Sequence, residues 1–332
     1  MELTTLWFLL IAGLWIGYFV LEGFDFGVGI LLRVLGRDEP ERRAVITTIG
    51  PVWDGNEVWL IVASGATFAA FPEWYASLFS GFYLPLFAIL VSLIIRGVAL
   101  EYRGKRDEPA WRSRWDTAIT VGSVVSAFLW GITFANLVRG VPLDADHEYV
   151  GGLSDLFSPY AVLGGLAVTG LFVAHGAIFL ALRTTDEIRA RANRLAARTG
   201  LIAVLLVVGF LVWTQAIRGD DASAVIAGAA AVALLAGLVA NRLRHEGWAF
   251  VGTALAIGLA VASLFVAMFP DVMPSSLDPA WSLTTANAAS TPYTLKILTV
   301  VAAIFTPLVL LYQGWTYWVF RKRVSVEPVA VS

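Results

Sequence analysis

The chain has 332 residues, of which 58% are hydrophobic and only 14% charged, and its formal net charge is -2. Soluble domains carry about 25% charged residues, so this composition indicates a membrane protein, and the near-neutral charge gives no indication of nucleic-acid binding. The absence of cysteine excludes disulfides, iron–sulfur clusters, thiolate metal sites and a cysteine nucleophile.

Nine stretches of the chain are apolar and long enough to cross a bilayer, which takes about 20 helical residues. They cover residues 4–32, 44–71, 76–100, 117–138, 157–182, 199–217, 222–241, 248–269 and 294–320. The first stretch lacks the basic segment and the cleavage site of a signal peptide, so we expect it to be retained. The sequence therefore predicts an all-α, multi-pass membrane protein with nine transmembrane helices, built as a single integral membrane domain over residues 1–332.

The loops between these stretches alternate in basic content. Of the 23 Lys and Arg residues, 19 follow the first, third, fifth, seventh and ninth stretches. Basic loops remain in the cytoplasm, so the alternation predicts an amino terminus outside the membrane and a carboxyl terminus in the cytoplasm. An even number of helices would break this pattern.

The first stretch carries two acids inside a run of apolar residues and glycines. Glu22 and Asp25 are three residues apart and therefore share one face of a helix. Asp25 lies about 12 Å inside the cytoplasmic boundary when the helix rise is counted back from Arg33. A charge at such a depth is costly, so these acids are candidates for a functional site.

The second stretch repeats the three-residue spacing with Asp54 and Glu57. This stretch runs opposite to the first, so the two acid pairs are expected to meet at a similar depth. If Pro51 begins the helix, Asp54 lies in its first turn near the surface, where the helix dipole favours an acid. If the helix begins near Arg43 and Pro51 only kinks it, Asp54 lies about 16 Å deep.

Two further polar residues lie inside predicted helices. Arg96, about 10 Å from the inner end of the third stretch, has two alternative roles: it pairs with the acids as their counter-ion, or it holds the head group of a lipid or quinone. His175, about 12 Å inside the fifth stretch, either relays protons or bonds to a neighbouring helix.

The acids themselves have two interpretations. In the first, carboxyl groups in a water-lined crevice form a proton-conducting path. In the second, the acids and Arg96 form a structural cluster that orders the first three helices.

Haem ligation by this chain is not expected. Haem b normally takes axial His or Met ligands. The chain has three residues of each type: His147, His175, His245, Met1, Met268 and Met273. This set is too sparse to hold several haems, and no metal site is predicted.

Four motifs together carry a resemblance to a known family. They are Gly23-Phe24-Asp25-Phe26-Gly27-Val28-Gly29, Pro51-Val52-Trp53-Asp54-Gly55-Asn56-Glu57-Val58-Trp59-Leu60, Ser80-Gly81-Phe82-Tyr83 and Met273-Pro274-Ser275-Ser276. With these motifs the chain resembles, from end to end, subunit II of the cytochrome bd family of quinol oxidases.

The resemblance implies an assembly in the bacterial cytoplasmic membrane. In this family subunit I holds two b-type haems and one d-type haem and oxidises quinol, while subunit II holds no haem. The complex reduces oxygen to water with protons from the cytoplasm. The resemblance also implies two four-helix bundles plus one extra helix, contact with membrane lipids, a small single-helix accessory subunit and a structural quinone.

Site residues follow from the same resemblance. Asp25, Asp54 and Arg96 match charged positions of the family, and Asp54 lies in the Trp53-Asp54-Gly55-Asn56 motif that is proposed to lie on a proton route. Glu22 replaces an Asp found in many relatives and is kept as a member of the route. Glu57 and His175 stand where some relatives have Gln, so both are secondary candidates.

The sequence therefore predicts the haem-free subunit of a bd-type quinol oxidase, with a proton path through Asp54, Asp25 and Glu22. One alternative is an ion-coupled secondary transporter, which calls for inverted repeats and interrupted helices in both halves of the chain. Here the acids and interruptions concentrate in the first third. The other alternative is a subunit that serves assembly alone.

Overall fold

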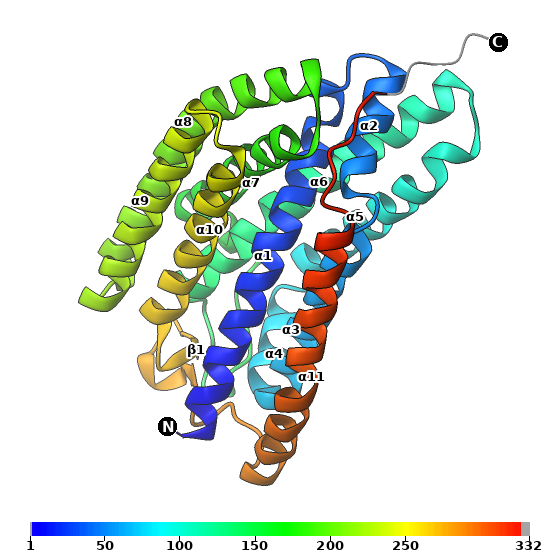
Figure 1. Cartoon of the computed structure of the whole chain (residues 1–332). Coiled ribbons are helices and arrows are strands. Elements are labelled where there is room, and N and C mark those ends of the chain that lie inside the picture. Colours follow the sequence, from blue (N-terminus) through cyan, green and yellow to red (C-terminus); the bar gives the residue numbers. More distant parts are fainter. Residues whose placement is uncertain (1, 327–332) are drawn as a thin grey trace, which may run out of the picture.

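The structure is a computed structural model that describes residues 2–326, so residues 1 and 327–332 of the predicted domain lie outside it. The chain forms long helices that run side by side, with short strands at one end (Figure 1). The helices are α1 (Leu3–Leu35), α2 (Glu39–Ile49), α3 (Trp53–Ala70), α4 (Pro72–Gly81), α5 (Tyr83–Tyr102), α6 (Pro109–Arg139), α7 (Pro159–Arg183), α8 (Asp186–Arg218), α9 (Asp221–Arg242), α10 (Glu246–Met268) and α11 (Pro292–Val319). The strands are β1 (Asp271–Met273) and β2 (Leu283–Thr284), and single 3-10 turns cover Arg103–Lys105, Leu153–Phe157 and Pro279–Trp281.

Eight of the described helices, α1 and α5 to α11, are long and apolar enough to cross a membrane. This finding confirms the predicted class, an all-α multi-pass membrane protein.

Two predicted spans are wrong as single helices. The stretch 44–71 breaks at residues 50–52, between α2 and α3. Pro51 causes the break because it lacks an N–H group and its ring crowds the carbonyl four residues earlier. The stretch 76–100 breaks at Phe82, where Pro85 acts in the same way on the carbonyl of Gly81.

The break at Pro51 gives Asp54 a position that combines the two predicted alternatives. Asp54 does lie in the first turn of its helix. However, α2 comes before that turn and adds 11 residues, or about 16 Å, between Asp54 and the end of the bundle where α2 begins. Asp54 is therefore both in a first turn and far from that end.

Helices α1 and α7 lie at the centre of the bundle. Helix α1 contacts α3 and α6, α7 contacts α8 and α10, and α1 and α7 contact each other at the centre. Gly27 and Gly176 meet at that contact, where a Cβ atom on Gly27 would overlap the carbonyl oxygen of Phe172. Only glycine allows the two helices to approach this closely.

Ion pairs join the five loops that carry most of the basic residues. They link the segments that follow α1, α5, α7, α9 and α11, so these segments lie at one end of the bundle. The pairs are Arg103–Glu39 (2.8 Å), Arg191–Glu41 (2.6 Å), Arg189–Glu246 (2.7 Å) and Arg323–Glu246 (3.7 Å). The chain ends are marked at opposite ends of the bundle (Figure 1). We call the ion-paired end the basic end.

Glu39 makes the basic end sensitive to acid. Burial alone would raise its pKa, but the hydrogen bonds and charge of Arg103 and the charge of Arg112 outweigh burial and hold the pKa below the usual value. A lowered pKa in the folded state means stability that is present above the unfolded pKa, about 4.3, and is lost as pH falls through the folded pKa.

We therefore expect Glu39→Gln to lower the unfolding temperature at neutral pH, by an amount that corresponds to about 1 kcal/mol or less because the pair is partly solvated. The difference from the unsubstituted protein should shrink towards zero near pH 3, and thermal unfolding at a series of pH values measures it. A difference that is constant with pH would contradict this origin.

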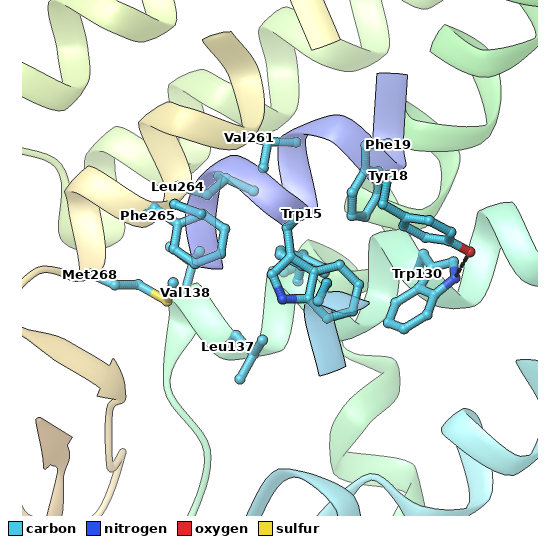
Figure 2. Packing of buried hydrophobic residues seen from close by; sticks show 14 of the residues in the cluster. Trp15, Tyr18, Phe19, Trp130, Leu137, Val138, Val261, Leu264, Phe265 and Met268 are labelled. Carbon is cyan, nitrogen blue, oxygen red and sulfur yellow. Dashed lines mark hydrogen bonds between the residues drawn. The ribbon is translucent and has the colours of Figure 1, made fainter. Parts of the chain in front are cut away.

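The opposite end of α1 packs into an aromatic core. Trp15, Tyr18 and Phe19 of α1 lie beside Trp130 of α6, and Trp130 Nε1 donates a hydrogen bond of 3.0 Å to the Tyr18 hydroxyl (Figure 2). The rings of Trp15 and Trp130 have centroids 5.1 Å apart in an edge-to-face arrangement. Apolar residues of α10 complete this part of the core (Figure 2).

Two loops cover the end of the bundle opposite the basic end. The Met273–Ser276 motif lies in the second of these loops, where Met273 is fully buried and the Ser275 hydroxyl donates to the carbonyl of Leu143 at 2.8 Å. The amide of Val141 donates to the carbonyl of Pro274 at 3.0 Å. The motif therefore joins the loop after α6 to the loop after α10.

Candidate functional site

Four charged side chains from three helices meet inside the bundle. Glu22 and Asp25 come from α1, Glu57 from α3 and Arg96 from α5. Glu22, Asp25 and Arg96 are fully buried, while 23% of the Glu57 side chain is exposed. We call these four residues the acid cluster.

Arg96 lies at the centre of the acid cluster. Its Nη1 atom is 3.4 Å from a carboxylate oxygen of Glu22 and 3.5 Å from one of Glu57. Its guanidinium carbon lies 5.0 Å from the centre of the Phe26 ring, which adds a cation–π contact. This geometry favours the counter-ion role for Arg96 over binding of a lipid or quinone head group.

Asn56 connects the acid cluster to α11. Its side-chain amide donates a hydrogen bond of 2.6 Å to Asp25 Oδ2. Its own oxygen accepts hydrogen bonds from the Tyr317 hydroxyl at 2.7 Å and from Gln313 Nε2 at 3.0 Å. Because two donors hold the oxygen of Asn56, its NH₂ group must point towards Asp25.

The other motif residues support this connection. Gly55 faces Gln313, whose side-chain oxygen would lie 3.8 Å from a Cβ atom on Gly55, an ordinary contact distance. The Trp53 ring packs against Gly97 of α5, where a Cβ atom would lie 3.4 Å away. Trp53, Gly55 and Asn56 therefore set how α3 meets α5 and α11.

Gln313 and Tyr317 were missed by the sequence analysis. Their only signal is a four-residue spacing, which places both on one face of α11. Nothing local marks them as partners of a residue that lies more than 250 positions earlier.

The charges of the acid cluster do not balance. One guanidinium can neutralise one carboxylate, whereas the acid cluster holds three carboxyl groups, two of which pair with Arg96. Uncompensated charges are costly in a buried site. Carboxyl groups this close together gain and lose protons as one unit and not as independent acids. The arrangement can therefore store and exchange protons.

Asp54 lies apart from the acid cluster. Its side chain is exposed on the outer face of α3, without a hydrogen bond or ion pair to any residue that the structure describes. The predicted meeting of the two acid pairs therefore holds for Glu57, through Arg96, and is wrong for Asp54.

His175 is also separate from the acid cluster. It is fully buried on α7, its Nδ1 atom lies 2.7 Å from the Thr253 hydroxyl of α10, and its ring stacks on Phe250 with centroids 4.6 Å apart. This arrangement fits the alternative in which His175 bonds to a neighbouring helix.

Fold and site together define a multi-pass α-helical membrane protein with a buried, ionisable cluster. Among residues 2–326, no group of three or more His, Asp or Glu side chains has a geometry that could hold a metal ion.

Comparison with known proteins identifies the family. The family model for cytochrome bd terminal oxidase subunit II matches residues 3–320. The chain is 42% identical to the cytochrome bd ubiquinol oxidase subunit 2 of Bacillus subtilis (strain 168), over 99% of both chains. It is 36% identical to the cytochrome bd-I ubiquinol oxidase subunit 2 of Escherichia coli (strain K12), over 98% of this chain and 96% of that one.

The fold agrees with this family. A chain from the structure of the bd oxidase of Geobacillus thermodenitrificans superposes with a TM-score of 0.80, over 97% of this chain and 100% of that chain, at 18% identity. The chain belongs to the cytochrome bd terminal oxidase subunit II family, as the motifs predicted. It is thus a membrane subunit of a respiratory oxidoreductase complex.

Proposed function

We propose that this chain is the haem-free subunit of a quinol:oxygen oxidoreductase in a bacterial cytoplasmic membrane. Its acid cluster passes protons to a haem-bearing subunit I, which holds two b-type haems and one d-type haem and where oxygen is reduced to water. The observation that carries this proposal is the acid cluster itself, in which Glu22 and Glu57 pair with one buried guanidinium and a third buried carboxyl group, that of Asp25, lies one helical turn from Glu22.

The histidines of this chain do not suit a b-type haem. His175 is fully buried, with its Nδ1 atom 2.7 Å from the Thr253 hydroxyl and its ring stacked on Phe250, so packed side chains occupy the space beside the ring. His147 lies in a loop, where its Nδ1 atom is 2.9 Å from the carbonyl oxygen of Trp281, and His245 precedes α10. The donor set therefore supports placing the haems in the partner.

The proposed topology has nine membrane crossings. Eight are the apolar helices, and α2 and α3 together make the remaining one between α1 and α4. The basic end lies in the cytoplasm because basic loops are retained there. The amino terminus is then outside and α11 ends at the cytoplasmic side. This agrees with the figure, in which α1 begins and α11 ends at opposite ends of the bundle (Figure 1).

Arg96, the two acids of α1 and the neighbouring Asn56 have distinct tasks in this proposal. Arg96 lowers the cost of an ionised carboxylate in the membrane by supplying one positive charge. Glu22 and Asp25 accept and release protons. Asn56 holds Asp25 in place through its 2.6 Å hydrogen bond and keeps one Asp25 oxygen occupied as an acceptor.

Asp54 points to the surface that the partner covers. An ionised carboxylate that faces lipid at this depth costs several kcal/mol, so protein or water must cover the outer face of α3. Exposed apolar residues occur on the same helix and on two other helices of the acid cluster and its connection, among them Ile61 of α3, Ile94 of α5 and Leu308 of α11. We place subunit I on this face, with Asp54 between the acid cluster and the partner.

The two alternative functions, a secondary transporter and an assembly subunit, call for different structural features. A secondary transporter needs interrupted helices in both halves, whereas the breaks near Pro51, Phe71 and Phe82 all fall in the first third and α7 to α10 are continuous. The alternative of a subunit that serves assembly alone has its own support, because the acid cluster joins α1, α3 and α5, and Asn56 links α3 to α11. Substitutions that preserve assembly distinguish this role from proton transfer.

We expect Asp54→Asn, in the complete complex with its full haem content, to slow oxygen consumption by about 10-fold or more, because a proton-transfer group is usually worth at least that factor. The exposed acid Glu73 of α4 provides the control variant Glu73→Gln, which should leave the rate unchanged. Oxygen consumption at the normal rate in D54N would remove Asp54 from the route.

A further inference from the structure

Five hydroxyl groups form a row that winds along α6. They belong to Ser113, Thr117, Thr120, Ser123 and Ser126, which are spaced by three or four residues. Contacts place the row against α1: Arg33 Nη1 donates to the Thr117 hydroxyl at 3.0 Å, and the Thr120 hydroxyl donates to the carbonyl of Gly29 at 3.1 Å. The row therefore follows the seam between α1 and α6.

The row leads from the basic end towards Glu22. On one side of Glu22, Gly29 lies against Ser123, whose hydroxyl would overlap a Cβ atom at position 29. On the other side, Tyr18 meets Trp130 through a 3.0 Å hydrogen bond. Because α1 and α6 are antiparallel, Ser126 lies at the level of Glu22, between these two contacts.

The inner members of the row are buried and lack protein partners. The hydroxyls of Ser123 and Ser126 are fully buried, without a hydrogen bond to any of the described residues, and Glu22 is fully buried with an ion pair of 3.4 Å to Arg96 but no hydrogen bond in the described part of the chain. Buried polar groups are almost always hydrogen-bonded, and ordered water serves where the chain offers no partner. Ser113 and Thr117, by contrast, are partly or fully exposed at the basic end.

The same seam is closed on the other side of Glu22. Beyond Tyr18, the aromatic rings of Trp15, Phe19 and Trp130 fill the space between the helices (Figure 2). The Phe19 and Phe134 rings pack edge to face with centroids 4.9 Å apart. The seam is therefore polar towards the basic end and sealed towards the opposite end.

We infer that the α1/α6 seam is the route by which the acid cluster takes up protons from the aqueous phase at the basic end. A proton passes along Thr117, Thr120, Ser123 and Ser126, with water molecules between the hydroxyls, and adds to a carboxylate oxygen of Glu22. One proton leaves the cluster towards the partner for each proton that arrives. This inference rests on the proposed function of the acid cluster.

The test is the double variant Ser123→Ala with Ser126→Ala, in the complete complex. We expect oxygen consumption to fall by about 3- to 10-fold, as for the loss of a proton-transfer path, and the ratio of rates in H₂O and D₂O to increase. The haem content should be normal, because only two oxygen atoms are removed. The control is Thr133→Val. Thr133 lies on α6 between the aromatic residues Trp130 and Phe134, and its buried hydroxyl donates to the carbonyl of Leu129 in the same helix at 2.8 Å.

The outcomes separate this inference from the proposed function. A slower rate with an unchanged solvent isotope effect would show a packing role for the serines and overturn the route. Normal turnover in the serine variant, alongside slow turnover in Glu22→Gln, would also overturn the route but leave the proton-conducting cluster intact. If Glu22→Gln is normal as well, the proposed function itself fails. Should the double variant assemble poorly, S126A alone serves with the same readouts.

Discussion

Replacing Arg96 with methionine is expected to prevent most of the complex from assembling. The substitution leaves Glu22, Asp25 and Glu57 buried without a counter-charge, and removing one partner of a buried ion pair typically costs about 3–5 kcal/mol. It also removes the contact that joins α1, α3 and α5 inside the bundle. The measurements are the yield of intact complex from membranes and its unfolding temperature in detergent.

A matched substitution at the basic end separates charge burial from loss of an arginine in general. Arg112 pairs with Glu39 at 3.1 Å near the surface, so R112M should cost about 1 kcal/mol or less. Adding Glu22→Gln to R96M should restore part of the yield, since one buried charge is then removed. Wild-type yield and unfolding temperature for R96M alone would show that the acid cluster does not need its guanidinium.

Asp25→Asn is expected to have the opposite profile, with normal assembly and slow turnover. The amide oxygen of an asparagine can still accept the 2.6 Å hydrogen bond from Asn56, so the link to α11 survives. The side chain can no longer bind and release a proton. We expect oxygen consumption to fall by about 100-fold, within the usual range for loss of a proton-transfer group.

The control for this variant is Asp221→Asn, which alters an exposed acid at the start of α9, away from the acid cluster. The optical spectrum of the complex must show its full haem content before the rates are compared. A D25N complex that consumes oxygen at the unsubstituted rate would exclude Asp25 from the proton path and favour the assembly role.

Much of this architecture could be predicted from hydrophobicity and spacing. Long apolar runs specify helices in a membrane, and the three-residue spacing of Glu22 and Asp25 correctly placed both acids in one region of the bundle. Arg96 was predicted either to be their counter-ion or to hold a lipid or quinone head group, because an isolated charge is costly at that depth.

Other features depend on tertiary packing and have no local signal. Pro51 and Pro85 lie in apolar runs, and sequence alone does not decide whether a proline kinks a helix or breaks it. Asp54 and Glu57 lie one turn apart on α3, yet only Glu57 is turned far enough inwards to pair with Arg96, while Asp54 stays exposed. Tyr317 matters because its hydroxyl donates a hydrogen bond to Asn56, which lies on another helix, and no pattern near Tyr317 in the sequence indicates this contact.

Helix α11 illustrates a further limit of prediction from one chain. Within the described part of the chain, only Leu295 of this helix is fully buried, yet Gln313 and Tyr317 hold Asn56 beside Asp25. Most of its exposed side chains are apolar, so they suit either lipid or a partner. The polar contacts, and not the apolar ones, therefore fix how α11 is attached.

Proton uptake during a single turnover tests the central claim most directly. The complete complex is reduced and mixed with oxygen, while a pH-sensitive dye reports protons taken from the medium and absorbance reports the haems. We predict that D25N keeps rapid electron transfer but delays proton uptake in proportion to its slower turnover. Proton uptake in D25N that keeps pace with the unsubstituted complex would contradict the claim that this subunit carries protons to its partner.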